Sequence, residues 1–519
     1  MRTKHSIFNI TAGLANQLII TSLSFISRTI FIGALGIEYL GVQGLFTNIF
    51  AMLSLAEAGI GSSIIYSLYK PVADHNIARI NALMRLYKNA YLAIAVVILI
   101  LGLVLFPFLP LFLKDSSVDH INIIYLIFLL NTVAPYLFQY KISFLNVNQK
   151  NYVVTLIYSA SSIITMCLKI GILYYTKNFI LFLIVESIIT ISTSIILAGL
   201  VNKKYPFLKS KEVTKLDAST KKGIIKNIKA IILQNVGVFL VLSTDNIIIS
   251  SFVGIAAVGL YSNYSMLIEI CRNFSYQISN NIHHSVGNLV ATESKEKIYS
   301  IFKVSLFSNF WLYSFSSIFM YVVIEPFITL WIGKEFLMGK TILIILLLIF
   351  FERGMRNSIT MVKNTAGIYH EDRFAPLIQA AINLGTSLIL VKFIGITGVF
   401  LGTLISVISV PLWLTPLLVY RKVFQVPFFK YWGIYFLYFG IALMTCFITE
   451  SFCKYVIPNG NLNFLLKVTT CLLLPNIIFL VLFFRTQEFR YLVSVGGIVV
   501  EKLYKRVKVI SRLRRDASV

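Results

Sequence analysis

The sequence is poor in charged residues and in cysteine, and each shortage excludes a class of protein. Charged residues make up only 13% of the 519 residues, about half of their share in soluble domains. Because 57% of the residues are apolar, the chain is neither a soluble globular domain nor a disordered chain. The five cysteines form no CxxC pair, so neither a disulfide framework nor a metal site is predicted.

Signatures of catalysis are missing as well. The chain has no Walker-type lysine loop, no HExxH pair and no dinucleotide-binding glycine fingerprint. The sequence therefore predicts no cofactor and no catalytic residue, and we expect the chain not to be an enzyme.

Long apolar runs are what the chain has in abundance. A transmembrane helix needs about 20 apolar residues, and about 14 such helices account for the apolar content. The sequence thus predicts an all-α polytopic membrane protein with about 14 transmembrane helices. The runs lie near residues 8–33, 40–66, 87–113, 120–140, 152–175, 178–200, 228–253, 257–280, 302–332, 338–362, 376–394, 397–420, 430–449 and 464–484.

The basic residues gather on one side of these predicted spans. Lys and Arg number 46 against 21 Asp and Glu, which gives a formal charge of +25. With the N-terminus inside, 33 of the 46 basic residues fall in inside segments and 7 in outside loops. Cytoplasmic loops of membrane proteins collect Lys and Arg, so both termini are predicted to be cytoplasmic. Because this distribution already explains the positive net charge, no nucleic-acid partner is predicted.

A short motif occurs twice in the chain. The segment that begins at Gly36 and Ile37 has the pattern G-I-x-x-Φ-G-Φ, and the segment that begins at Gly254 and Ile255 has the same pattern. Six predicted helices separate the two copies. Because six is an even number, the second copy enters the membrane in the same orientation as the first, which predicts a parallel repeat.

The repeat predicts a division of the chain. Residues 1–202 form an N-lobe of helices 1–6, and residues 228–425 form a C-lobe of helices 7–12. A basic cytoplasmic linker, 203–227, joins the lobes. Helices 13 and 14 follow in 426–485, and 486–519 is predicted to be a basic amphipathic helix on the inner leaflet.

Four segments resemble a known family of bacterial membrane proteins. They are Ser27–Gly41, Leu55–Gly61, Asp245–Tyr261 and Ala380–Gly402, and the resemblance extends over essentially the whole chain. The family is the polysaccharide transporter branch of the multidrug/oligosaccharidyl-lipid/polysaccharide (MOP) exporter superfamily. It includes Wzx-type flippases and is similar to the peptidoglycan-precursor flippase and to MATE drug exporters.

The resemblance implies two MATE-like six-helix lobes around a central cavity that opens alternately to either side. It implies a flippase that moves undecaprenyl-diphosphate-linked oligosaccharide across the bacterial cytoplasmic membrane for capsule, O-antigen or exopolysaccharide synthesis. Membrane lipids, the polysaccharide polymerase and the chain-length machinery are the other partners that it implies. In the peptidoglycan relative the last two helices add a lipid-tail groove, which the resemblance carries onto residues 430–484.

Basic residues inside the predicted spans are the candidates for a substrate cavity. A charge in a span costs roughly 2.5 to 3.5 kcal/mol on insertion scales, so it usually faces the bundle interior. Arginine suits a diphosphate because its donors are bidentate and keep their charge. The candidates are Arg28, Lys141, Arg272 and Arg356. Lys141 has the alternative of extending to the membrane surface, and Arg272 that of pairing with Glu269 three residues earlier.

Acidic residues inside the spans are candidates for ion coupling or for a gate. Glu57 and Asp245 are the two that we single out, because burial tunes the proton affinity of carboxylates. A contact between Arg28 and Asp245 would form a gate between the two halves. Lys169 and Glu186 are expected to pair within the first lobe.

Two other functions compete with the flippase. Five acids against six bases within the spans leave the sign of the cavity open, so an exporter of small amphipathic cations, as in the MATE branch, is the main alternative. A membrane glycosyltransferase or polymerase is the third. It is disfavoured because the longest predicted outside loop, 449–463, offers little room for an external active site.

Overall fold

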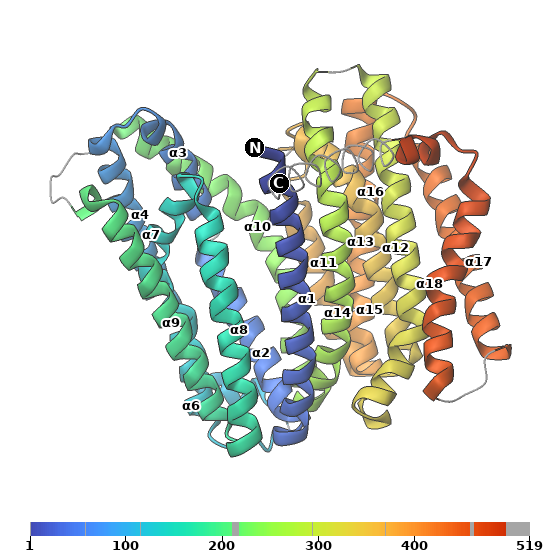
Figure 1. Cartoon of the computed structure of the whole chain (residues 1–519), viewed down its shortest axis with the longest axis horizontal. Helices are drawn as coiled ribbons and strands as arrows, with labels where there is room; N and C mark the ends of the chain where they lie inside the picture. The colour runs from blue at the N-terminus through green and yellow to red at the C-terminus, as the bar shows by residue number, and fades with distance from the viewer. Residues whose placement is uncertain are drawn as a thin grey trace, which may run out of the picture. The chain divides into compact units, whose positions relative to one another are not determined.

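The structure of the chain is a computed structural model that describes residues 2–57, 59–114, 116–209, 217–292, 294–368, 370–456 and 461–494. These residues form α-helices, short 3₁₀ and π turns and connecting loops, with no β-strand among them, and the long helices run side by side as bundles (Figure 1). The protein is therefore the all-α polytopic membrane protein that the composition predicts. The predicted amphipathic tail lies mostly outside the described residues, as does part of the basic linker.

The α-helices are α1 (Arg2–Leu35), α2 (Ile37–Leu53), α3 (Ile60–Ala73), α4 (Ile77–Leu105), α5 (Leu109–Phe112), α6 (Ile121–Val133), α7 (Tyr136–Val147), α8 (Asn151–Thr176), α9 (Phe179–Lys204), α10 (Ala218–Phe252), α11 (Ile255–Thr292), α12 (Lys295–Trp331), α13 (Lys340–Thr365), α14 (Ala375–Ile394), α15 (Ile396–Ser409), α16 (Pro411–Val419), α17 (Phe429–Tyr455) and α18 (Asn461–Phe483). Each predicted apolar run falls on one of these helices or on consecutive ones.

Four of the predicted runs are interrupted within their length. The run 87–113 changes to a 3₁₀ turn at Phe106–Phe108, between α4 and α5. The run 40–66 is interrupted by a 3₁₀ turn and by Gly59, whose φ of 82° is left-handed. The run 120–140 is interrupted where Pro135 precedes α7, and the run 397–420 where Pro411 begins α16. Proline has no backbone N–H to donate and clashes with the preceding helical turn, which explains the interruptions at these two positions.

Nine helices within the described residues are long and apolar enough to cross a membrane, and the bent pair α1–α2 adds a tenth if it counts as one span. Charged residues lower the apolar character of α13, since it carries Glu352, Arg353 and Arg356 at mid-helix. The predicted number of about 14 spans is compatible with this arrangement.

The chain forms two compact units. The first comprises residues 1–265 and 373–406, and the second comprises 266–372 and 407–519. This division differs from that of the repeat, because α10 and the start of α11 belong to the first unit. The predicted lobe boundaries remain a prediction.

In the second unit, aromatic side chains hold α17 and α18 against α12. Phe310 of α12 stacks on Tyr438 of α17 with ring centroids 4.4 Å apart. Trp311 donates from its indole N–H to the amide oxygen of Asn476 in α18 over 2.7 Å. These contacts combine a large buried apolar area with a directional bond, so they fix the position of the last two helices on the bundle.

In the first unit, the two copies of the repeated motif form equivalent turns. Between α1 and α2 the chain bends by 120° at Gly36, whose φ is 87°. Its counterpart Gly254 joins α10 to α11 with a φ of 134°. Residues with a side chain rarely adopt such angles, so glycine is required at both turns.

The two helical hairpins pack against each other reciprocally. A Cβ atom placed on Gly41 would meet the carbonyl oxygen of Ile255, and one placed on Gly259 would meet the carbonyl oxygen of Ile37. Gly41 and Gly259 have the same place in the two copies of the motif, as do Ile37 and Ile255. An exchange of partners of this kind is what a two-fold relation between two copies produces. We call this contact between the hairpins α1–α2 and α10–α11 the hairpin seam.

Candidate functional site

Arg28 lies in α1 beside the hairpin seam. Its guanidinium Nη1 donates to the hydroxyl of Ser262 in α11 over 2.9 Å. The side chain is half-buried, and among the described residues no carboxylate lies within 4 Å of it. A cation inside an apolar bundle is therefore held by a neutral hydroxyl, which leaves its charge without a counter-charge.

The repeat places a second, weaker contact opposite the first. Asn246 has the place in the second copy that Arg28 has in the first, and its amide nitrogen lies 3.5 Å from the carbonyl oxygen of Gly44. Ser262 in turn is the counterpart of Gly44. The two contacts are equivalent, so Arg28 and Asn246 have corresponding places on the two hairpins.

Asp245 belongs to a polar network rather than to an ion pair with Arg28. The hydroxyl of Thr403 in α15 lies 3.1 Å from each of the two Asp245 carboxylate oxygens. Asn383 of α14 donates its amide to the Thr403 oxygen over 2.8 Å. In this structure the predicted Arg28–Asp245 contact is not made, as no ion pair joins these two described residues.

Further oxygen atoms surround this network. The carbonyl oxygen of Val399 lies 3.1 Å from the hydroxyl of Ser387 and 3.3 Å from that of Thr403. Three helices, α10, α14 and α15, thus bring a carboxylate, two hydroxyls, an amide and a carbonyl together. Such a set of oxygens suits a proton or a hard cation, which prefers oxygen ligands.

Glu57 lies in a cluster of tyrosines in the same unit. The Tyr91 hydroxyl donates to its carboxylate. Tyr91 packs edge-on against Tyr87, with ring centroids 4.8 Å apart, and Tyr87 donates to Ser143 over 3.0 Å. No Lys or Arg among the described residues lies within 4 Å of Glu57. The Glu57 carboxylate thus has a neutral hydroxyl as its partner. Arg28 has the same kind of partner, although its charge is of the opposite sign.

The other basic candidates have different surroundings. Arg272 forms an ion pair with Glu269, which is the alternative that the spacing of three residues predicts. Arg356 binds Glu352 one turn earlier, with Nε 2.7 Å from Oε1. The ammonium of Lys141 lies 5.7 Å from the centroid of the Tyr140 ring. Arg28 differs from Arg272 and Arg356 because its partner is a neutral hydroxyl from a distant helix.

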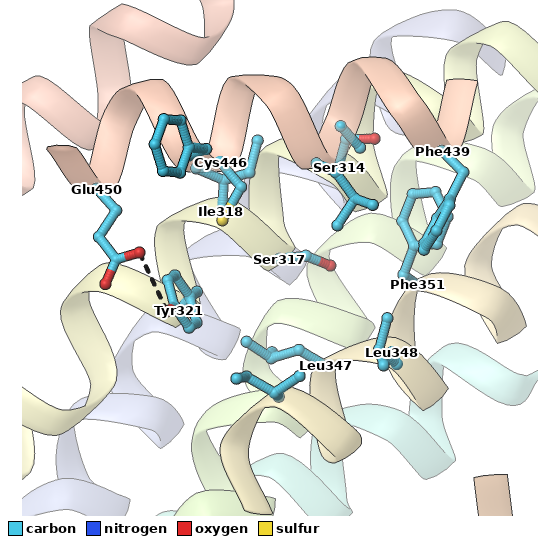
Figure 2. A pocket seen from close by; sticks show the side chains of 14 residues that line it. Ser314, Ser317, Ile318, Tyr321, Leu347, Leu348, Phe351, Phe439, Cys446 and Glu450 are labelled. Carbon is cyan, nitrogen blue, oxygen red and sulfur yellow. Dashed lines mark hydrogen bonds between the residues drawn. The ribbon is translucent and has the colours of Figure 1, made fainter. Parts of the chain in front are cut away.

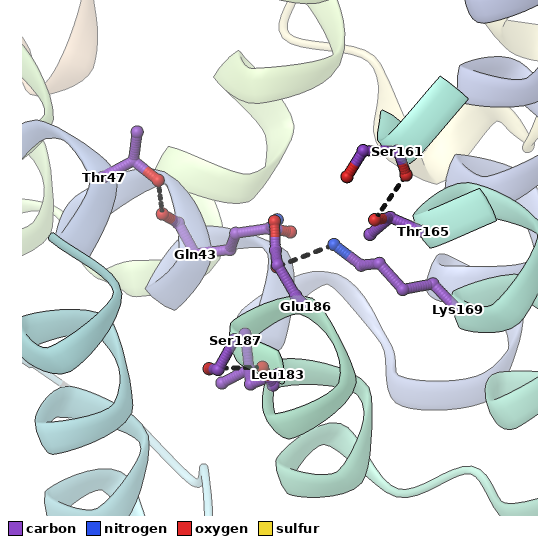
Figure 3. Close-up of polar contacts among 8 residues, drawn as sticks. All are labelled: Gln43, Thr47, Ser161, Thr165, Lys169, Leu183, Glu186 and Ser187. Atoms are coloured by element: carbon purple, nitrogen blue, oxygen red, sulfur yellow. Dashed lines mark hydrogen bonds and ion pairs between the residues drawn. The ribbon is translucent and has the colours of Figure 1, made fainter. Parts of the chain in front are cut away.

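The expected pair of Lys169 and Glu186 is present in the structure. The Lys169 ammonium lies 2.8 Å from the carboxylate and 3.9 Å from the centroid of the Phe182 ring. Figure 3 shows the pair between α8 and α9, with the side chain of Gln43 pointing to the same place. Only 10% of the Lys169 side chain is exposed, so this pair balances a buried charge within the bundle.

Sequence reasoning missed the neutral partners Ser262, Thr403 and Tyr91. One signal was present, since Asn383 is an amide in the middle of a predicted span. A polar side chain inside a membrane helix usually faces a partner or a cavity. The identity of its partners depends on how distant segments fold together, and the sequence alone does not supply that.

No protein-family model matches the chain, and no curated protein matches its sequence. Solved structures do match its fold. One described as the lipid II flippase MurJ in an inward closed conformation has 15% sequence identity and a TM-score of 0.65, and the match covers 92% of this chain and 99% of that one.

Two drug transporters of the MATE type match as well. An inward-facing MATE family transporter of the MOP superfamily has 13% identity and a TM-score of 0.58, covering 78% of this chain and 94% of its own. The MATE multidrug transporter DinF-BH has 18% identity and a TM-score of 0.54, covering 79% and 94%. At these identities the likeness establishes the fold alone, which the chain shares with these three transporters.

Proposed function

We propose that this protein is a flippase that moves an undecaprenyl-diphosphate-linked oligosaccharide from the inner to the outer leaflet of the bacterial cytoplasmic membrane by alternating access. The observation that carries the proposal is Arg28, a half-buried arginine whose hydrogen-bond partner is the neutral Ser262 hydroxyl. A buried charge without a counter-charge is costly, so an anionic ligand gains by supplying one. The fold shared with MOP-superfamily transporters supports the proposal.

A diphosphate fits Arg28 well, because its oxygens accept two parallel hydrogen bonds from one guanidinium. The ligand is expected to displace Ser262 when it binds. Since Ser262 belongs to the opposite hairpin, the exchange links substrate binding to the opening of the hairpin seam. A ligand shifts a conformational equilibrium only through such differential contacts.

The Asp245 network is the proposed coupling site. Binding a cation or a proton at Asp245 would change the bonds that Thr403 and Asn383 make, and these residues join α10 to α15 and α14. We expect Asp245→Asn and Thr403→Val to abolish the dependence of transport on an ion gradient. Imposing a sodium gradient or a proton gradient separately shows which ion drives the protein.

A second candidate function, export of small amphipathic cations, rests on Glu57. Its carboxylate has no described basic residue within 4 Å, so a cationic ligand could supply the missing charge. The same position serves a proton, which makes Glu57 a second coupling candidate if the flippase function holds.

Purified protein in sealed liposomes separates the two functions. A lipid-diphosphate oligosaccharide is placed in the liposomes, and its arrival in the outer leaflet is followed with a glycosidase that cannot cross the membrane. Faster arrival than in protein-free liposomes supports the flippase. Unchanged arrival together with faster uptake or efflux of a cationic dye would replace it with the cation exporter. If the Arg28→Ala variant keeps both the flipping and the dye-transport activity, the main argument for a substrate-binding cavity at Arg28 is removed.

A further inference from the structure

Two adjoining pockets in the second unit have the composition of a lipid site. The first, of about 270 Å³, is apolar and lies between α12, α13 and α17. Its lining includes Ile318, Leu347, Phe351 and Phe439, which Figure 2 shows around its centre. We call it the apolar pocket.

The second pocket is larger, about 840 Å³, and basic. Four lysines line it, together with two glutamates, Glu325 and Glu450, so the lining carries a net charge of +2. The lysines are Lys334, Lys340, Lys454 and Lys467. We call it the basic pocket. It lies where the α12–α13 connection and the facing ends of α17 and α18 meet.

Tyr321 and Glu450 line both pockets and mark the junction between them. The Tyr321 hydroxyl donates to one Glu450 oxygen over 3.1 Å, as the dashed line in Figure 2 shows. Lys340 approaches the other oxygen, also at 3.1 Å. The apolar pocket therefore adjoins the basic pocket at the polar side chains of Tyr321 and Glu450. A lipid with a hydrocarbon chain and an anionic headgroup matches this arrangement, since its chain fits the apolar pocket and its headgroup fits the basic pocket.

Two serines in the wall of the apolar pocket specify the lipid further. The hydroxyls of Ser314 and Ser317 are buried and have no hydrogen-bond partner among the described residues. At 1.5 Å per residue they lie about 10 Å and about 6 Å from Tyr321 along α12. A buried donor without an acceptor costs free energy, so these positions call for an acceptor on the ligand. A glycerophospholipid has ester carbonyls just below its headgroup, whereas a polyprenyl chain has no acceptor there.

The basic pocket also favours one headgroup. Glu325 has no ion-pair partner within 4 Å among the described residues, and its carboxylate is an acceptor beside the lysines. A headgroup that combines one phosphate with hydroxyl groups would bond to both kinds of residue. We propose that the two pockets together bind an anionic glycerophospholipid of the phosphatidylglycerol type, with its phosphate among the lysines and one acyl chain in the apolar pocket.

This site is separate from the proposed transport cavity and does not depend on the proposed function. Its predicted side of the membrane is the outer one, because Lys334, Lys340, Lys454 and Lys467 all belong to the few basic residues of the predicted outside loops. A lipid seated there would brace α17 against α12 and α13. Its loss would loosen the second unit without touching Arg28 or Asp245.

The test measures lipid retention by the purified full-length protein with native mass spectrometry during a titration with phosphatidylglycerol. The double variant Lys334→Gln/Lys454→Gln is expected to bind about 30-fold more weakly, since each lysine near a lipid surface contributes about fivefold. The control is Lys177→Gln/Lys392→Gln, which removes two exposed lysines of the same predicted side from the other unit. Equal weakening in both double variants would mean unspecific attraction and would overturn the proposal.

Ser317→Ala tests the part of the site that is proposed to hold the acyl chain and its ester group. Wild-type protein should bind ester-linked phosphatidylglycerol more tightly than its ether-linked analogue by roughly two- to twelvefold, because the ether lacks the carbonyl acceptors. The variant should show a smaller difference between the two lipids, and the double variant Ser314→Ala/Ser317→Ala should bind both equally, while the melting temperatures without lipid show whether the variants are folded. If polyprenyl phosphate displaces phosphatidylglycerol from the wild type at a lower concentration, the site belongs to the carrier lipid and the proposal is wrong.

Discussion

Arg28 is the single residue on which the proposed transport chemistry depends most. Its charge lies in a span, and its hydrogen-bond partner is the neutral Ser262 hydroxyl, over 2.9 Å. Lysine retains the charge but loses the planar fork that binds two phosphate oxygens together. Arg28 therefore contributes in two separable ways, by its charge and by its geometry.

Substituting Arg28 separates these contributions. A hydrogen bond to a charged group is worth about 1.5–3 kcal/mol, so Arg28→Lys is expected to lower the flipping rate roughly tenfold and Arg28→Ala by roughly a hundredfold. Flipping is measured with the liposome assay described above. Arg421→Ala, which removes an exposed arginine far from Arg28 in the sequence, is the matched control and should flip at the wild-type rate. Equal rates for Arg28→Ala and wild type would contradict a substrate role.

Glu371 provides a residue-scale prediction outside the membrane. Its carboxylate accepts a hydrogen bond from Lys422, and this contact holds the pKa of Glu371 below its usual value. A lowered carboxyl pKa adds stability that is complete above the unfolded pKa and disappears as pH falls through the folded pKa. We therefore expect the melting temperature of wild type to exceed that of Glu371→Gln at pH 7 and the gap to close below about pH 4.

That measurement needs a partner variant. Lys422→Gln removes the other half of the same contact and should show the same pH-dependent gap. A gap that stays constant from neutral pH into the acid range would show that the Glu371–Lys422 contact is not what the substitution removes.

At the scale of elements, the hairpin seam explains why the repeated motif contains glycines. Gly41 and Gly259 each face a backbone carbonyl of the other hairpin, so neither position has room for a side chain. Gly33, in α1, has no atom within 4 Å of the place where its Cβ would lie. Comparing the three positions therefore distinguishes two roles of glycine. At Gly41 and Gly259 it allows the two hairpins to approach closely, whereas at Gly33 it only makes the backbone more flexible.

Alanine substitutions test the seam directly. Gly41→Ala and Gly259→Ala are each expected to destabilise the protein by about 1–3 kcal/mol, because the new methyl group forces the hairpins apart. The two costs should be similar, since the contacts are equivalent. Gly33→Ala should stabilise α1 or leave it unchanged. Denaturant unfolding in lipid bicelles gives the three values, and a cost at Gly33 as large as at Gly41 would contradict the packing explanation.

How far the sequence predicts these elements depends on how local their cause is. The helices followed from apolar runs, and the turns at Gly36 and Gly254 followed from a repeated pattern, because both are properties of neighbouring residues. The pairing of Lys169 with Glu186 was within reach for the same reason, as their helices are consecutive. The Glu352–Arg356 pair was missed although its spacing of one helical turn was visible.

Contacts between distant segments were not predictable in this way. Thr403 and Asp245 come from different predicted helices far apart in the chain, and so do Ser262 and Arg28. Many hydroxyls could have filled either role, and only the packing of α15 near α10 and of α11 near α1 selects these two. The charges of the site could thus be predicted, while its neutral partners could not.

At the scale of the whole molecule, the first prediction concerns orientation. The distribution of basic residues predicts that Arg79 lies in a cytoplasmic loop and Lys334 in an outside loop. In intact cells, a thiol reagent that cannot cross the membrane should label Lys334→Cys and should leave Arg79→Cys unlabelled until the membrane is opened. The reverse pattern would invert the topology. The labelling of each variant is compared with that of the unsubstituted protein, whose five cysteines give the background.

The second whole-molecule prediction concerns alternating access. If the hairpin seam closes one side of the pathway, as the proposed function requires, then it has to open once in every transport cycle. A Cβ placed on Gly44 lies 3.3 Å from a methyl carbon of Val258 on the opposite hairpin. That methyl carbon is bonded to the Cβ of Val258 and lies where the sulfur of a cysteine could stand. A disulfide needs Cβ atoms about 3.8 Å apart, which is within reach here, so cysteines at these two positions should cross-link in the closed state.

The double variant Gly44→Cys/Val258→Cys should therefore stop flipping after oxidation and recover it after reduction, with no loss in either single variant. Gly33→Cys/Val258→Cys is the control pair, because the Cβ position of Gly33 has no neighbour within 4 Å, and it should not cross-link. Wild-type flipping by the fully cross-linked double variant would mean that the seam stays closed during transport. The route across the membrane would then have to avoid the seam, and Arg28, which bonds across it to Ser262, would hold the hairpins together instead of meeting the substrate.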